Sequence, residues 1–137
     1  MTALNQHRNP KVQGNVGLGA AIAYFCFLGY GVSLPLNDSQ PYDLIVDDGH
    51  NLLRVQIKTV WAKAKSGRYT CDLRTTGGFY GKYTFKHFDP ESCDLLFILT
   101  GDGSQYLIPA SQIHVGAQLT LGLAHSQYLV SGSLLAI

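Results

Sequence analysis

The chain has 137 residues, of which 46% are hydrophobic and 14% charged, and its formal net charge at pH 7 is +1. The low charge and high apolar content exclude a disordered chain, and the length predicts one domain over residues 1–137. No apolar run is long enough for a membrane helix, and no leader pattern directs the chain to secretion. The three cysteines form no paired motif, which is typical of a reduced, cytoplasmic protein.

The charges are separated along the chain although they nearly cancel in total. Between Arg54 and Lys86 the only acid is Asp72, and after Lys86 there is no Lys or Arg at all. The basic residues of this segment are Arg54, Lys58, Lys63, Lys65, Arg68, Arg74, Lys82 and Lys86. This asymmetry predicts a basic face for a polyanion, and the alternative is a solvated face without a partner.

The first predicted element is a helix over Val12–Leu28, because apolar residues recur there at three- and four-residue spacing. Gly17 and Gly19 weaken its first turns, so the helix could also begin later than Val12. Gly29 is a candidate for its C-terminal cap. A short extended piece over Leu34–Leu36 follows, interrupted by Pro35.

Two strands are predicted next, over Tyr42–Asp47 and Leu52–Val60, on either side of the turn signal Asp48-Gly49. Polar and apolar residues alternate over Arg68–Thr75, which predicts a third strand. The glycine-rich stretch Thr76–Lys82 is expected to be a flexible loop.

A second hairpin is predicted from strands over Asp94–Thr100 and Gln105–Ile108, joined at Gly101-Asp102-Gly103. A turn or short helix over Ala110–Ile113 follows, and the remaining apolar stretch has no clear pattern. A helix followed by a mixed, mostly antiparallel sheet predicts an α/β (α+β) fold.

The first hairpin carries the most informative polar residues. In its second strand Arg54, Gln56 and Lys58 share one face, because side chains alternate along a strand. A four-residue loop places Asp43 opposite Gln56, whereas a two-residue turn places Asp43 opposite Arg54. Either register brings a carboxylate, an amide and an ammonium group to one face of the hairpin.

These groups suit metal-assisted cleavage of a phosphodiester. Asp43 offers a hard oxygen ligand to Mg²⁺, which needs few protein ligands, and the Gln56 side chain and the Ile57 carbonyl could add neutral oxygens. Lys58 could orient the attacking water or stabilise the charge that develops on the phosphate. The alternative is an ordinary ion pair from Asp43 to Lys58 or Arg54 across the strands. His87 and Asp89 could also share a metal, but no further ligand follows at a useful spacing.

The runs Pro41–Asp47 and Arg54–Thr59 resemble the PD-(D/E)XK nuclease superfamily, and more closely its cyanobacterial group I intron-encoded homing endonucleases. Gly14–Tyr24 is similar to the first helix of that family, and Tyr106–Pro109 to a late strand. The resemblance implies a restriction-endonuclease-like core and a sequence-specific double-strand DNA endonuclease that depends on Mg²⁺.

The resemblance assigns roles to individual residues. Asp43 matches the metal-binding Asp, Lys58 the catalytic Lys, and Gln56 the first position of a Q-x-K variant. The residues themselves, and not the resemblance, suggest the Ile57 carbonyl as a further metal ligand beside Asp43. The expected catalytic set is Asp43, Gln56 and Lys58. The expected DNA-binding side chains are those of Arg54, Lys63, Lys65, Arg68, Arg74, Lys82 and Lys86. Because a protomer of 14.9 kDa spans little DNA, a homodimer or homotetramer is expected.

One position departs from the family pattern. The first helix of the family reads Gly-Glu, with the Glu completing the metal site, but here Leu18 follows Gly17. Asp47, or less favourably Asp38, could supply the second carboxylate. The chain is therefore either an active nuclease or a catalytically impaired relative that still binds DNA. A third interpretation is an interaction module whose hairpin only pairs charges.

Overall fold

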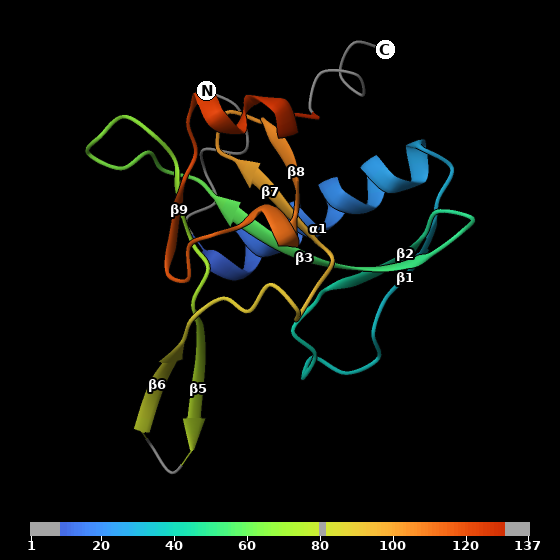
Figure 1. The fold of residues 1–137 in the computed structure, drawn as a ribbon, viewed down its shortest axis with the longest axis horizontal. Coiled ribbons are helices and arrows are strands. Elements are labelled where there is room, and N and C mark those ends of the chain that lie inside the picture. The colour runs from blue at the N-terminus through green and yellow to red at the C-terminus, as the bar shows by residue number, and fades with distance from the viewer. Residues whose placement is uncertain (1–8, 80–81, 131–137) are drawn as a thin grey trace.

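The computed structural model describes the backbone of residues 9–79 and 82–130, and the side chains of 9–75 and 85–130. One helix precedes a five-stranded sheet of order β1-β2-β3-β7-β8, in which only the central pair β3–β7 is parallel (Figure 1). The elements are α1 (Pro10–Phe27), β1 (Gly31–Ser33), β2 (Leu44–Asp47), β3 (Leu52–Val60), β4 (Thr70–Asp72), β5 (Thr75–Phe79), β6 (Lys82–Lys86), β7 (Leu95–Thr100), β8 (Gln105–Pro109), β9 (Gln118–Thr120) and the 3₁₀ turns η2 (Ala110–Gln112) and η3 (Leu123–Tyr128).

Helix α1 begins at Pro10, two residues before the predicted start. The reason is the local sequence: the side chain of Asn9 accepts a hydrogen bond from the Lys11 N–H over 2.9 Å, and Pro10 suits the first helical turn. The helix ends as predicted before Gly29, whose φ of +82° is a conformation that glycine adopts at low cost.

The β2–β3 hairpin has the register that follows from a four-residue loop. Asp47 pairs with Leu52 and Leu44 with Val55, which excludes the two-residue turn. The Asp48 carboxylate closes the loop by accepting hydrogen bonds from the N–H groups of His50 and Asn51, over 2.8 and 2.7 Å. β3 has the predicted bounds, and β2 begins two residues later than predicted.

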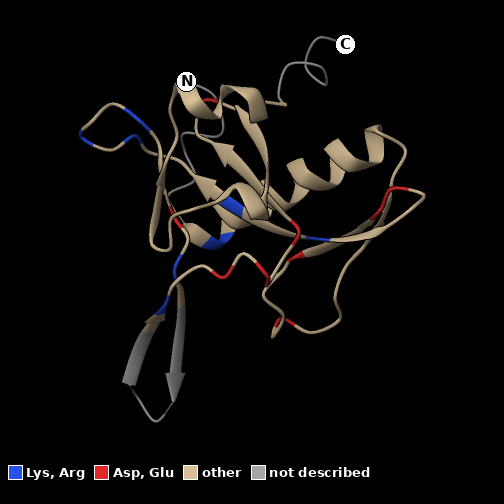
Figure 2. Cartoon of the chain, viewed as in Figure 1, with Lys and Arg blue, Asp and Glu red and all other residues tan. Residues whose placement is uncertain are grey.

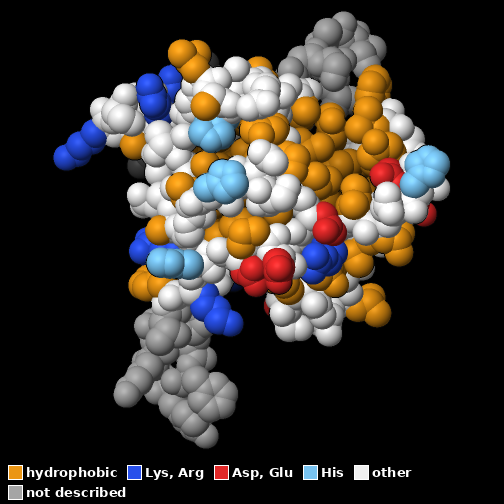
Figure 3. Space-filling view, in the orientation of Figure 1, with side chains coloured by type: hydrophobic (Ala, Val, Ile, Leu, Met, Phe, Trp, Pro, Cys, Tyr) orange, Lys and Arg blue, Asp and Glu red, His pale blue; other side chains and the backbone are white. Residues whose placement is uncertain are grey.

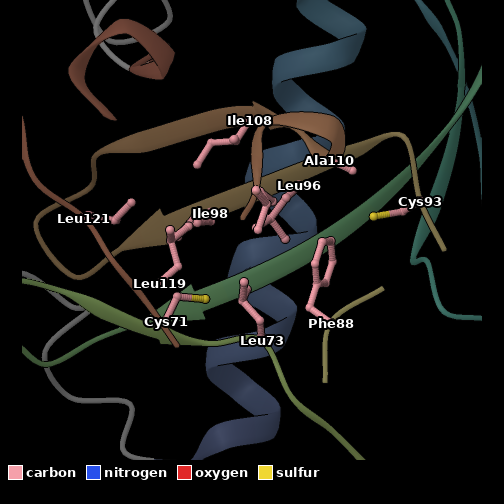
Figure 4. Packing of buried hydrophobic residues seen from close by; sticks show 11 residues of the cluster. Cys71, Leu73, Phe88, Cys93, Leu96, Ile98, Ile108, Ala110, Leu119 and Leu121 are labelled. Atoms are coloured by element: carbon pink, nitrogen blue, oxygen red, sulfur yellow. The ribbon is translucent and has the colours of Figure 1, made fainter. Parts of the chain in front are cut away.

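The sheet has a buried apolar cluster on each face. On one face α1 packs against β2, β3 and β7 through Ala21, Phe25, Leu44, Val55 and Phe97. Gly17 lies directly against β3, because a Cβ at this position would collide with Thr59 Oγ1. The opposite face is covered by β4, β9 and the segments around them (Figure 4).

Three predictions in the middle of the chain need correction. The strand expected over Arg68–Thr75 is confined to β4, which pairs with β9 instead of joining the main sheet. The loop expected at Thr76–Lys82 is instead largely strand, because Thr75–Phe79 pairs with Lys82–Lys86 as a hairpin that extends away from the other elements (Figure 1). Backbone pairing requires no side chains, so glycines weaken such a ribbon without preventing it.

The extended piece expected at Leu34–Leu36 lies instead at Gly31–Ser33, where β1 pairs with β2. Pro35 has no N–H to donate to a strand ladder, which explains the shift. The second hairpin and the turn after it are confirmed as β7, β8 and η2.

No helix in the described part of the chain is long and apolar enough to cross a membrane.

Candidate active site at the end of strand β2

Asp43 directly precedes the first residue of β2, and its side chain adds a hydrogen bond to β3 beyond the last backbone pair. The Asp43 N–H donates to the Val55 carbonyl over 2.8 Å, and Asp43 Oδ2 accepts from the Ile57 N–H over 2.7 Å. The N–H and C=O of one strand residue point to the same side of the strand. The Ile57 carbonyl therefore points toward the same open edge as its N–H, next to the Asp43 carboxylate.

A hollow of about 820 Å³ opens at this edge. Its walls are the first half of α1, the segment 34–43 and the β3 residues Ile57, Lys58 and Thr59. Asp43 and Lys58 both line it, as the sequence predicted. The hollow brings a carboxylate, an ammonium group and the edge of a strand within reach of one bound molecule.

Lys58 is half-buried, and because side chains alternate along β3 it faces away from Ile57, which packs in the α1 cluster. Its positive charge helps to lower the pKa of Asp72, although the hydrogen bonds from Arg74 are the larger cause. It acts in the same direction on Cys71, where burial dominates and raises the pKa of the thiol to about 12. Lys58 thus lies between β4 and the Asp43 hollow.

Gln56 is placed differently from the other two. It is buried and lines a second, smaller hollow of about 280 Å³ that neither Asp43 nor Lys58 lines. The three residues expected at one site therefore line two hollows: Asp43 and Lys58 line the larger one, and Gln56 lines the smaller one.

The ordinary ion pair considered for the hairpin does not form among the described residues. Arg54 pairs with Asp94 instead, at 3.3 Å between Nε and Oδ2, and its guanidinium also donates to the carbonyls of Glu91 and Ser92. The hydrogen bond from the Arg54 N–H is the main cause that lowers the pKa of Asp94. Arg54 therefore ties β3 to the start of β7, and its contact with DNA stays a prediction.

Leu18, where the resemblance to the family leads one to expect a Glu, lines the hollow together with Asp43. Asp47 cannot replace that Glu, because it lies at the opposite end of β2 and its Oδ1 accepts from the Gly49 N–H over 2.8 Å. Asp38 does line the hollow, and its side chain has no hydrogen bond or ion pair with the described residues. The preference for Asp47 over Asp38 was thus wrong.

The remaining basic residues form two groups (Figure 2). Lys63, Lys65 and Arg68 are exposed on the loop between β3 and β4, which the bridge between Lys63 and Tyr69 closes. Arg74 pairs with Asp72 at 3.0 Å and lies 4.8 Å from the centre of the Phe85 ring.

Lys86 is exposed at the end of β6, and the side chain of Lys82 lies outside the described residues. The connection that follows β6 carries acidic side chains instead (Figure 2).

Sequence reasoning missed both the position of Asp38 and the second hollow. Asp38 lies in a turn between the helix and the hairpin, where no periodic pattern reports which wall a side chain joins. The second hollow unites Gln56 with residues that follow β6, and only the tertiary fold brings these together. The sequence hinted at this second hollow only through His87 and Asp89, which were considered as a possible metal pair and which both line it.

The oxygen atoms near Asp43 limit which metal ions the larger hollow could hold. Over residues 9–79 and 82–130 no group of three or more His, Cys, Asp or Glu side chains could hold a metal ion. Two carboxylates and one backbone carbonyl remain around the larger hollow, from Asp43, Asp38 and Ile57. Mg²⁺ is commonly held by one or two carboxylates together with substrate phosphates and water, so this set fits that ion.

Comparison with known proteins agrees with this geometry. The chain is similar in structure to the bacterial homing endonuclease I-Ssp6803I, with 28% sequence identity, a TM-score of 0.73, and a match that covers 83% of this chain and 78% of that one. Comparison with curated proteins gives no match. A model of the PD-(D/E)XK endonuclease family matches residues 8–128. The expected fold class is thereby confirmed, and the chain belongs to the PD-(D/E)XK endonuclease family.

Proposed function

We propose that this endonuclease is a Mg²⁺-dependent, sequence-specific double-strand DNA endonuclease of the homing type. The observation that carries the proposal is the hollow beside the start of β2. Asp43, which accepts a hydrogen bond from the Ile57 N–H, and Lys58 both line this hollow. The likeness to a bacterial homing endonuclease supports the homing class.

Asp43 and the Ile57 carbonyl would hold the metal, and Asp38 would supply the second carboxylate. A bound Mg²⁺ supplies positive charge to the scissile phosphate and to the attacking water. Asp43 is held in place by its bond to the Ile57 N–H, so it needs no rearrangement to present its other oxygen. The acids and bases that line the hollow balance, two of each: Asp38 and Asp43 against Lys11 and Lys58. The metal would therefore bind weakly until DNA adds phosphate oxygens.

Lys58 would orient the attacking water or stabilise the charge on the phosphate as the bond breaks. Lys58 is half-buried, and its charge acts on Cys71 and Asp72 of β4, so the positions that its ammonium group can reach are restricted. Gln56 was expected to act at the same metal or water, but it lines the neighbouring hollow. The chemistry therefore rests on Asp43 and Lys58.

The DNA-binding surface would combine the loop that carries Lys63, Lys65 and Arg68 with the β5–β6 hairpin and its cations Arg74, Lys82 and Lys86. A two-stranded ribbon fits the major groove of DNA. One protomer spans too little DNA to specify a rare site, so a symmetric dimer or tetramer would bind the target.

The proposal is tested by incubating the wild-type chain with supercoiled plasmid that carries an intron-insertion-type target. Cleavage in Mg²⁺ or Mn²⁺ that EDTA abolishes is the expected result. Tight DNA binding with no cleavage in either metal would contradict it.

That contradicting result is what the second candidate function predicts, namely a catalytically impaired DNA-binding relative. Leu18 is the observation that favours it, because this side chain presents hydrocarbon to the hollow where the family pattern has a carboxylate. Binding would then depend strongly on salt, since it would come from contacts to phosphates.

A further inference from the structure

Gln56 offers a polar side chain, unpaired within the described part of the chain, at the wall of the second hollow. Gln56 is only 9% exposed, and its side chain makes no hydrogen bond among the described residues. It is not one of the described residues with a fully buried unpaired polar atom, which agrees with its place at the wall of a hollow. Because this amide has no partner among the described residues, it can donate a hydrogen bond to a ligand in the hollow.

The second hollow provides the setting for this ligand. It lies between β3 and the segment that follows the β5–β6 hairpin, and Thr75, Lys86 and His87 line it together with Gln56. Histidine and basic side chains gather where the hairpin joins the other elements (Figure 3). Its one carboxylate, Asp89, accepts a hydrogen bond from the Glu91 N–H over 2.9 Å. The hollow therefore offers the ammonium group of Lys86 and the amide, hydroxyl and imidazole donors of its other lining residues, a set that can hydrogen-bond an anion.

The two hollows lie side by side along one segment of chain. Pro41 lines the smaller hollow, whereas Gln40, Tyr42 and Asp43 line the larger. Gln56 precedes Lys58 by two residues on the same strand face, roughly 7 Å along the strand. This separation is of the order of one nucleotide step in a DNA backbone.

We propose that the smaller hollow binds the phosphodiester group adjacent to the one that is cut, through the Gln56 amide, the Lys86 ammonium group and the His87 ring. The identity of the ligand as a DNA phosphate rests on the proposed function, whereas the affinity of the hollow for an anion does not. Gln56 is then a DNA-binding residue and not a ligand of the metal.

The first test compares Gln56→Leu with the matched control Gln118→Leu, whose glutamine lies on β9 outside both hollows. Gln56→Leu should weaken duplex binding about tenfold, the effect of losing one hydrogen bond to a charged group, and leave Mn²⁺ affinity measured without DNA unchanged. Its melting temperature should not fall, because the Gln56 side chain makes no hydrogen bond with the described residues that the variant could break. Loss of Mn²⁺ affinity in Gln56→Leu, or wild-type DNA binding, would overturn the proposal.

The second test uses Lys86→Met and a duplex with a single methylphosphonate scanned across the cut site. Lys86→Met should reduce the slope of log affinity against log salt by about 0.9, the value for one phosphate contact. One methylphosphonate next to the cut should weaken the wild type but cause no further loss in Lys86→Met. Additive losses at every position would contradict the assignment.

The third test uses inorganic phosphate alone, followed by backbone amide NMR shifts with chloride as the reference. Shifts confined to the region of Gln56 and residues 86–89 are expected, and shifts elsewhere would overturn the anion site. A chain that gives these local shifts but binds no duplex would refute the proposed DNA function and leave the anion site supported.

Discussion

The carboxylate of Asp43 hydrogen-bonds to the backbone N–H of Ile57 over 2.7 Å, in the place where β2 would otherwise continue its ladder with β3. This contact fixes the side chain at the strand edge and leaves the Ile57 carbonyl directed to the same open side. A hollow of about 820 Å³ joins this edge to α1, so groups from three separate parts of the chain meet there.

Leu18→Glu should raise Mn²⁺ affinity and increase DNA cleavage in Mg²⁺, because it adds a carboxylate to the hollow that Asp43 lines. Asp38→Asn should lower Mn²⁺ affinity, and the double variant Leu18→Glu/Asp38→Asn should bind Mn²⁺ more tightly than Asp38→Asn alone. Leu18→Gln is the control with matched shape and no charge. Isothermal titration with Mn²⁺ measures each change, and equal affinity in Asp38→Asn and the wild type would exclude Asp38 as a ligand.

Gly17→Ala should lower the free energy of unfolding by about 1–3 kcal/mol, because the added Cβ collides with Thr59 Oγ1 and pushes α1 off β3. Gly19→Ala is the matched control, since a Cβ there meets no atom within 4 Å. It should stabilise the helix by up to about 1 kcal/mol. Urea denaturation followed by circular dichroism measures both, and equal effects would contradict the close approach of α1 to β3.

Arg54→Met should reduce stability at pH 7 by about 0.5–1 kcal/mol, since the Arg54–Asp94 pair is more than one-third exposed and screened by solvent. The pKa of Asp94 is lowered in the folded chain. Its stabilising effect is therefore complete above the ordinary carboxyl pKa of about 4, and it is lost as the pH falls through the lowered value. Denaturation at pH 7 and pH 3 should show the difference between variant and wild type shrinking. A large loss of DNA affinity with unchanged stability would instead show that Arg54 serves DNA binding and not the stability of the fold.

Lys65→Ala should weaken binding to all duplexes alike and reduce the salt slope by about 0.9, if this exposed lysine contacts a phosphate, as proposed, and reads no base. Fluorescence anisotropy at several salt concentrations measures the slope. An unchanged slope would place the loop between β3 and β4 away from the DNA.

Much of the site could be predicted from sequence because it depends on local pattern. The alternation of β3 places Gln56 and Lys58 on one face, and the Asp48-Gly49 turn limits the hairpin to two registers, one of which the structure shows. The division of these residues between two hollows was not predictable. It depends on the segment 34–43 and on the residues after β6, whose positions come from tertiary packing.

The glycine-rich stretch after Thr75 shows a second limit. Local propensity favoured a loop there, but pairing with Lys82–Lys86 forms a ribbon, and strand pairing depends on the partner as much as on intrinsic preference. The choice between Asp47 and Asp38 failed for a related reason. A shared strand face does not tell which end of the strand meets the helix.

The most direct test of the account is the rate of Mg²⁺-dependent DNA cleavage by Asp43→Asn, compared with that of Asp47→Asn at the other end of β2. Asp43→Asn should lower the single-turnover rate about 100-fold or more, because it removes the charged oxygen beside the Ile57 carbonyl, whereas Asp47→Asn should retain wild-type cleavage. Lys58→Met should lose cleavage as Asp43→Asn does and still bind the duplex. Undiminished cleavage by Asp43→Asn would show that this hollow is not the active site.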